Sequence, residues 1–154
     1  MELNSLKSAL LLLSFIVLTA CGGGGDSTES SAPPPKSMVE EEADPMENTG
    51  IGPVSSVTLA EVDAELASQG QKIFEEKCTA CHKVDKKFIG PSPKGILDRR
   101  NPAWVMNMIL NPENMVQQDA IAKKLLMEAN GAPMANQNLT QEEARAVLEY
   151  FRTL

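Results

Sequence analysis

Apolar residues recur at helical spacing through the second half of the chain, most clearly in its last segment. Thr140-Gln141-Glu142-Glu143 has the form of a capping box, which marks the start of a helix. The apolar positions that follow are spaced i, i+3, i+4 and i+7, at Ala144, Val147, Leu148 and Phe151. Arg145 and Glu149 lie four residues apart and can pair across the outer face of this helix.

Two more helices have clear start and stop signals. Asn101-Pro102 supplies an N-cap and a proline at the first helical position for the apolar run 103–110, and Asn111-Pro112 closes that run. A further helix begins at Asp119 and ends at Asn130-Gly131. Its apolar face consists of Ile121, Ala122, Leu125, Leu126 and Ala129.

A shorter helix precedes a pair of cysteines. It contains Gly70 and Phe74, and Glu75-Glu76-Lys77 continues it directly into Cys78. No run of alternating apolar and polar residues bounded by hairpin turns occurs in the sequence, which argues against strands. The pattern therefore predicts an all-α domain.

The N-terminus has the pattern of an export signal. Lys7 precedes the apolar run 9–18, which is too short to span a bilayer but has the length of a signal-peptide core. Leu18-Thr19-Ala20-Cys21 resembles the bacterial lipobox, so we expect a lipoprotein signal peptide at residues 1–20 and a lipidated Cys21. Multiple acyl chains attach a protein durably to a membrane without spanning it. The alternative is an ordinary signal peptide cut nearby, which leaves Cys21 as a free thiol.

The segment between this signal and the predicted helices is polar and acidic. It begins with Gly22-Gly23-Gly24-Gly25, continues through a stretch rich in Ser, Thr and Pro, and carries seven acidic residues and one lysine up to Leu59. Such a composition buries too little apolar surface to offset the entropy lost on ordering. We therefore expect a lipid anchor and flexible acidic linker at 21–59 and the domain at 60–154.

Charge and composition exclude several functions. The chain has 154 residues, enough for one small domain with appendages, and a net charge of -7, which argues against nucleic acid as the main partner. Three cysteines are too few for a disulfide scaffold, and a single histidine excludes a metal site with two histidine ligands.

The candidate chemistry lies in Cys78-Thr79-Ala80-Cys81-His82. Two cysteines with this spacing can attach one haem covalently, and the adjacent histidine can then bind the iron. A structural zinc site would need four ligands, and this chain offers only Cys78, Cys81 and His82 once Cys21 is lipidated. A thioredoxin-like redox pair would need a βαβ context, which the pattern lacks. A simple disulfide between the two cysteines is the third alternative.

Because the sole histidine is used, the sixth iron ligand must be another residue or be absent. Five methionines lie in the predicted domain: Met106, Met108, Met115, Met127 and Met134. The first two belong to an apolar helix, where methionine usually fills the core. Met115 lies where a loop could cover the haem, and Met127 falls on the polar side of its helix. Met134 lies in Gly131-Ala132-Pro133-Met134, a stiff loop between the last two helices, and is the favoured ligand.

At this point the sequence resembles the class I monohaem cytochromes c over residues 61–154. Gly70 and Phe74 resemble the glycine and aromatic residue of that family's first helix, and Tyr150 and Phe151 resemble their partners in the last. The resemblance implies a small helical domain around one covalent haem c, with His82 and Met134 as axial ligands. Proline precedes Met134 here, whereas the family pattern places it after the ligand methionine.

The same resemblance implies roles for residues around the haem. Gly90-Pro91 is similar to the segment whose proline carbonyl accepts a hydrogen bond from the proximal histidine. Trp104, with Arg99 or Arg100, is similar to residues that hydrogen-bond a haem propionate. The stretch 78–154 looks particularly like small cytochromes associated with nitrous oxide reductases.

These features together predict a lipid-anchored electron carrier in the bacterial cell envelope, facing the periplasm or the outside. It would carry single electrons from a quinol-oxidising complex to a terminal reductase or oxidase and would not be an enzyme. Basic residues outnumber acidic ones seven to two in 77–100, which would suit an acidic redox partner. The alternatives are a haem enzyme or gas sensor with an open sixth position, and a fixed cytochrome subunit of a respiratory complex.

Overall fold

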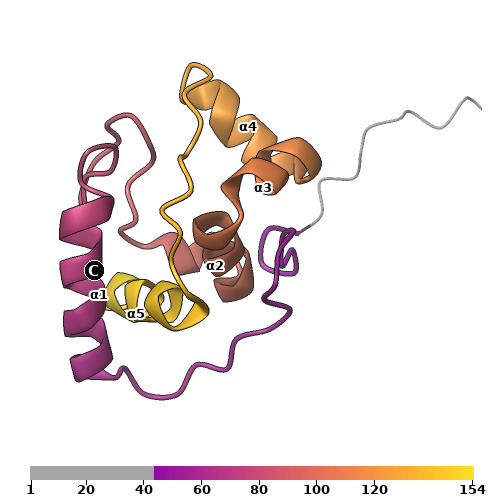
Figure 1. Cartoon of the computed structure of the whole chain (residues 1–154). Coiled ribbons are helices and arrows are strands. Elements are labelled where there is room, and N and C mark those ends of the chain that lie inside the picture. The colour runs from indigo at the N-terminus through magenta and orange to yellow at the C-terminus, as the bar shows by residue number, and fades with distance from the viewer. Residues whose placement is uncertain (1–43) are drawn as a thin grey trace, which may run out of the picture. The chain divides into compact units, whose positions relative to one another are not determined.

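The computed structural model of the chain describes residues 44–154, and these residues form helices joined by loops, with no strand among them (Figure 1). In chain order the elements are α1 (Ala64–Lys77), a 3-10 turn (Ile96–Asp98), α2 (Pro102–Leu110), α3 (Pro112–Gln118), α4 (Ala120–Glu128) and α5 (Gln141–Phe151). The prediction of an all-α domain is confirmed. The expected signal peptide and the lipidation site at Cys21 lie outside the described residues.

Two helices begin at the capping residues that the sequence indicates. The side chain of Asn101 accepts a hydrogen bond from the amide of Ala103 at the start of α2, and Pro102 is the first residue of that helix. Thr140 and Glu143 form the predicted capping box at the start of α5, each side chain bonded to the backbone of the other. These caps fix where α2 and α5 begin.

Helix α3 was not predicted. Asn111-Pro112 was interpreted as the end of the preceding helix, and it is that, because Asn111 caps the C-terminus of α2. Pro112 is also the first residue of α3. Proline has no amide hydrogen, but the first residue of a helix does not donate one within the helix, so a proline fits there. The same dipeptide therefore ends one helix and begins the next.

Helices α1 and α5 cross at Gly70 (Figure 1). A Cβ atom at Gly70 would lie 1.9 Å from the carbonyl oxygen of Ala146, so only glycine permits this approach. Above the crossing, the buried ring of Phe74 packs against the rings of Tyr150 and Phe151 at centroid distances of 5.6 and 5.7 Å. This crossing places the end of α1, and with it the cysteine motif, beside α5.

Residues 44–60 form a strap along the surface of the helices, which corrects the prediction that the flexible linker continues to residue 59. The fully buried side chain of Asn107 in α2 holds the strap at three points. Its Oδ1 accepts from the amide of Val54 over 3.0 Å, and its Nδ2 donates to the carbonyls of Thr49 and Val54. Polar contacts of this kind do not produce an apolar pattern in the sequence. The polar and acidic composition of residues 44–59 therefore indicated a flexible linker instead.

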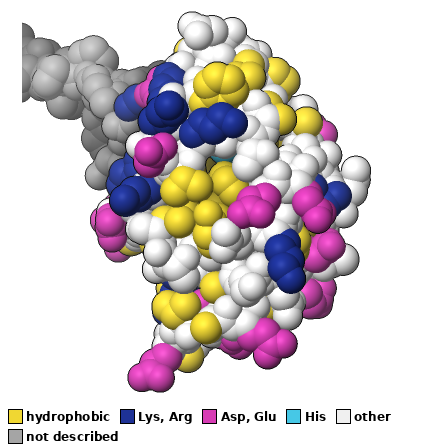
Figure 2. Space-filling view, turned by 90° about the vertical axis from the view of Figure 1, so that its left-hand side faces the viewer, with side chains coloured by type: hydrophobic (Ala, Val, Ile, Leu, Met, Phe, Trp, Pro, Cys, Tyr) yellow, Lys and Arg dark blue, Asp and Glu magenta, His cyan; other side chains and the backbone are white. Residues whose placement is uncertain are grey.

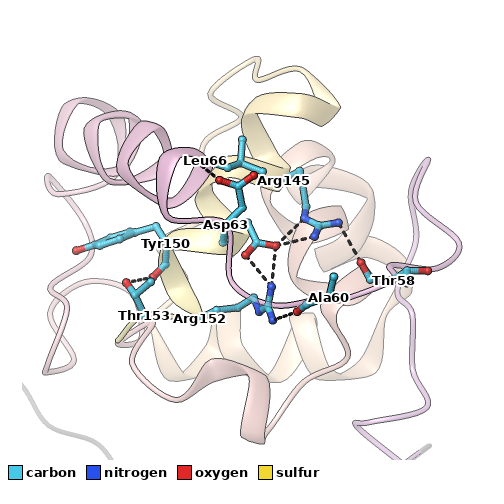
Figure 3. Close-up of polar contacts among 9 residues, drawn as sticks. Thr58, Ala60, Asp63, Leu66, Arg145, Tyr150, Arg152 and Thr153 are labelled. Carbon is cyan, nitrogen blue, oxygen red and sulfur yellow. Dashed lines mark hydrogen bonds and ion pairs between the residues drawn. The ribbon is translucent and has the colours of Figure 1, made fainter.

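The strap also contacts α5 through a cluster of three charged residues (Figure 3). Glu149 is only 1% exposed, and it pairs with Arg145 at 2.6 Å and with Arg152 at 2.7 Å. Arg145 donates to the carbonyl of Thr58, and Arg152 donates to the carbonyl of Ala60. The predicted pair of Arg145 and Glu149 is present, but the strap covers the face that was expected to be open to solvent.

Within residues 44–154, no helix has both the length and the apolar character that crossing a membrane requires.

Candidate functional site

A deep apolar cavity lies between the end of α1, the loop that follows it, α2, α4 and the loop before α5. Its volume is about 200 Å³. The residues that line it include Cys78, Cys81, His82, Pro91, Trp104, Met108, Leu125, Met134 and Phe151. The apolar face predicted for the helix after Asp119 supplies part of the wall, through Leu125, Leu126 and Ala129.

The cysteine motif enters the cavity because a single turn follows the end of α1. Cys78 caps the helix, and its amide donates to the carbonyl of Phe74. The amides of Cys81 and His82 both donate to the carbonyl of Cys78, over 3.1 and 2.9 Å. This turn brings Cys78, Cys81 and His82 to one wall of the cavity.

The two cysteines differ in their surroundings. Both are free thiols, with Cys78 half-buried and Cys81 exposed. Burial raises the pKa of the Cys78 thiol above its ordinary value, while Lys77 opposes that shift and Cys81 adds to it. The Cys78 side chain therefore stays protonated at neutral pH, which keeps it neutral within an apolar wall.

Backbone contacts orient the imidazole of His82. Its Nδ1 lies 2.8 Å from the carbonyl oxygen of Pro91, and since a carbonyl can only accept, Nδ1 carries the proton. The lone pair is then on Nε2, which is the atom available to bind a metal. Gly90 lies against the ring, because a Cβ atom there would be 2.3 Å from Cε1 of His82. The amide of Gly90 donates to the carbonyl of Cys81, which ties the two segments together.

Of the five candidate methionines, only Met108 and Met134 line the cavity. Met106 is in the core at 5% exposed. Met115 is fully buried on the side of the strap, where its sulfur accepts from the amide of Ile51 over 3.0 Å, so it does not cover the cavity as one alternative suggested. Met127 is 70% exposed and projects away from the core, as its place on the helix predicts.

Met134 comes from the irregular loop before α5, and it packs against the core from there. The loop follows Asn130 and Gly131, both with positive φ, at 54° and 78°. Because Met134 and His82 come from separate segments that line the same cavity, the structure brings the two predicted axial ligands to one site.

The residues expected near a haem propionate are placed differently. The indole Nε1 of Trp104 donates to Asp119 over 3.1 Å, so its only donor already has a protein partner. Arg99 donates to the backbone carbonyls of Ser92, Lys94 and Gly95 and does not line the cavity. Arg100 lies outside the lining as well, with its guanidinium 5.5 Å from the ring centroid of Trp104. Of the predicted group, Trp104 therefore lines the cavity, and Arg99 and Arg100 do not.

The local structure does not favour the alternatives for the cysteine motif. No group of three or more His, Cys, Asp or Glu side chains converges as a metal site in residues 44–154. The two cysteines are not joined as a disulfide, and the same part of the chain has no strand from which a thioredoxin-like unit could be built.

Basic and apolar side chains share the surface near the motif. Figure 2 shows Lys and Arg side chains gathered beside a patch of exposed hydrophobic side chains on this face. Phe88 and Ile89 are 54% and 43% exposed, and Lys83 lies 5.2 Å from the ring centroid of Phe88. Lys87 donates to the carbonyl of Glu128 at the end of α4, which joins this loop to the opposite rim.

Asp119 and the strap residue Asn48, both behind the cavity wall, were not identified as site residues from the sequence. In the sequence Asp119 indicates only the start of a helix, and it is indeed the N-cap of α4. The capping role accounts for an aspartate at this position, so nothing in the sequence indicated a second role. Nothing in the local pattern links Asn48 to a residue 71 positions later, although the structure joins them over 2.7 Å.

Known proteins share both the sequence and the architecture. The model of the cytochrome c family matches residues 67–154. The structure of cytochrome c from Rhodothermus marinus is similar, with 45% identity and a TM-score of 0.67, over 71% of this chain and 96% of that one. An engineered cytochrome c from the same organism, Rma TDE, gives 44% identity and a TM-score of 0.67 over the same shares.

A cytochrome c domain from Pseudomonas putida is more distant, at 28% identity and a TM-score of 0.50, over 55% of this chain and 85% of that one. No curated protein gives a significant match. With the cavity, the cysteine motif and the family match all falling in the same residues, the chain belongs to the cytochrome c family.

Proposed function

We propose that this protein is a membrane-anchored carrier of single electrons. The cytochrome c family implies covalent haem c and haem-based electron transfer, typically without enzymatic activity. The observation that carries the proposal is the presence of His82 and Met134 in the lining of one apolar cavity, with both motif cysteines on the same wall. A site that fills both axial positions from the protein transfers electrons without binding substrate at the metal.

The residues present fit haem c. Cys78 and Cys81 would hold it through thioether bonds, His82 would supply the proximal imidazole and Met134 the distal thioether. When bound, haem c supplies one-electron chemistry at its iron. The chain contributes the orientation of His82 through Pro91, an apolar wall that excludes water, and Lys77 in the cavity lining.

The alternative of a haem enzyme or gas sensor requires an open distal position. The loop that carries Met134 lies along the cavity, and it would have to move away to open that position. We therefore favour the electron carrier. A ferrous protein that does not bind carbon monoxide supports this assignment, whereas one that binds it readily supports a gas sensor or an enzyme.

We infer a lipid anchor at Cys21 from the sequence of the export signal. The test is expression of the full chain with a haem-ligation system, followed by separation of membranes. We expect the haem absorbance in the membrane fraction for the natural chain and in the soluble fraction for Cys21→Ser. Equal distribution of the two proteins would contradict the anchor.

The proposed donor is a quinol-oxidising complex, and the proposed acceptor is a terminal reductase, such as nitrous oxide reductase, or an oxidase. The sequence resemblance and the basic side chains near the cysteine motif support a carrier that works between these two partners. Membranes supplied with quinol should reduce the haem, and addition of nitrous oxide or oxygen should reoxidise it. Reoxidation that persists after salt washing, with the protein co-purifying in one complex, would instead indicate a fixed subunit.

A further inference from the structure

The carboxylate of Asp119 lies directly behind the cavity wall and is bonded from three segments of the chain. Its Oδ1 accepts from the indole Nε1 of Trp104 over 3.1 Å and from the amide of Ala122 over 2.8 Å. Its Oδ2 accepts from Nδ2 of the strap residue Asn48 over 2.7 Å. Asp119 is only 6% exposed, and it takes part in none of the ion pairs found in residues 44–154.

Trp104 connects this carboxylate to the cavity. Trp104 is 3% exposed and belongs to the lining of the cavity that the haem would fill. The guanidinium of Arg100 lies 5.5 Å from the ring centroid. The indole can take only one hydrogen-bonded orientation here, because Nε1 is its single donor.

The strap completes the arrangement. Asn48 places its Nδ2 on Asp119 because its own Oδ1 accepts from the amide of Gly50 over 2.8 Å. Gly50 in turn lies against Trp104 and Met115, since a Cβ atom there would be 3.1 Å from Cδ1 of the indole and 2.8 Å from the sulfur. The segment that follows the proposed tether is thus part of the shell around the cavity.

We propose that Asp119 is a positioning residue that fixes Trp104 in the wall of the haem cavity and that its buried charge lowers the reduction potential of the site. The inference rests on the proposed haem site. The oxidised site carries one more positive charge than the reduced one, so a negative charge within the protein stabilises the oxidised state. The low dielectric around Asp119 strengthens this effect, and no ion pair of Asp119 within residues 44–154 opposes it.

The test is Asp119→Asn in the full-length holoprotein. Asparagine is as good an N-cap as aspartate, so the start of α4 is preserved, and its oxygen still accepts from Trp104. We expect a higher reduction potential by spectroelectrochemical titration. Glu113→Gln removes the same charge from an exposed position on α3 and should leave the potential unchanged.

A second variant separates charge from packing. In Asp119→Asn the new side-chain NH₂ group faces the Nδ2 of Asn48, so two donors oppose each other. This lowers the stability of the fold independently of the lost charge. Asn48→Asp combined with Asp119→Asn restores a donor and an acceptor and moves the charge from residue 119 to the neighbouring side chain of residue 48. We expect this double variant to recover the unfolding midpoint and to bring the potential back part of the way toward the natural value, because the charge stays next to residue 119.

The near-ultraviolet circular dichroism of the single tryptophan reports its orientation independently. This band should stay unchanged in Asp119→Asn and Glu113→Gln, where Trp104 keeps its acceptor, and change in Asp119→Ala, where the acceptor is lost. An unchanged potential in Asp119→Asn would overturn the proposal, and so would a double variant whose potential stays as high as that of Asp119→Asn. Natural protein without haem absorbance would instead refute the haem site itself.

Discussion

The Nδ1 of His82 donates a hydrogen bond to the carbonyl oxygen of Pro91 over 2.8 Å, and this contact sets the direction of the imidazole. It fixes the tautomer as well, because the carbonyl accepts from Nδ1 and leaves the lone pair on Nε2. Outer hydrogen bonds of this kind orient metal-binding histidines and make them more basic. The strength of the iron–imidazole bond should therefore depend on the backbone at residues 90–91.

Gly90→Ala tests this dependence. The added Cβ atom would lie 2.3 Å from Cε1 and 2.8 Å from Nδ1 of His82, so the ring must move and the bond to Pro91 must lengthen. We expect an altered Soret spectrum and a changed reduction potential in the holoprotein. Both quantities staying at their natural values would show that the imidazole is not held by this segment.

Gly70→Ala should destabilise the fold while sparing the haem ligands. Alanine gains about 1 kcal/mol over glycine in a helix interior. The clash is larger, because the added Cβ atom would lie 1.9 Å from a backbone oxygen of Ala146, and overpacking typically costs about 1–3 kcal/mol or more. We expect a net loss of about 2 kcal/mol in denaturant unfolding. A stabilised variant would contradict the close crossing of α1 and α5.

Glu149→Gln should loosen the strap. The carboxylate is 1% exposed and pairs with two arginines, so its loss leaves Arg145 and Arg152 without a counter-charge. Breaking a buried pair costs about 3–5 kcal/mol, and the lower end applies here because both arginines reach solvent. Faster amide exchange at residues 58–60 should accompany the loss. The exposed Glu76→Gln is the control, and a similar loss there would show that the effect is one of net charge alone.

The titration of Tyr150, the only tyrosine in the chain, should report its surroundings directly. Burial raises its pKa above the ordinary value of 10.0, and the charge of Glu75 adds to that shift. A folded-state pKa above the unfolded one adds stability that is present below pH 10 and is lost as the pH rises through the folded pKa. Tyrosinate absorbance should therefore appear at higher pH in the folded protein than in denaturant.

Glu75→Gln provides the control for this titration. It removes the smaller of the two causes, so the pKa should fall part of the way toward 10.0 and remain above it. A midpoint at or below 10.0 in the natural protein would contradict the packing of Tyr150 beside Phe74.

Sequence reasoning succeeded where the signal is local. The caps Asn101 and Thr140 and the motif 78–82 are each encoded within a few neighbouring residues, and the structure places them as expected. It failed where one signal has two meanings, as at Asn111-Pro112, which both ends α2 and begins α3.

Reasoning from the sequence also failed where contacts are polar and distant. The strap is held by Asn107, more than 50 positions away, through backbone groups that any sequence possesses. Trp104 was assigned a partner by family resemblance, whereas its actual partner is Asp119, a residue that the pattern marks only as a helix cap. Neither contact changes the spacing of apolar residues, so no periodicity could disclose it.

The visible spectrum of the ferric holoprotein, with Met134→Ala and Met108→Ala beside it, tests the central claim most directly. Both methionines line the cavity, but only Met134 is assigned to the iron. We predict a methionine-sulfur charge-transfer band in the natural protein and in Met108→Ala, and its loss together with carbon monoxide binding to the reduced form in Met134→Ala. A band that survives in Met134→Ala, or natural protein that binds carbon monoxide readily, would contradict the account.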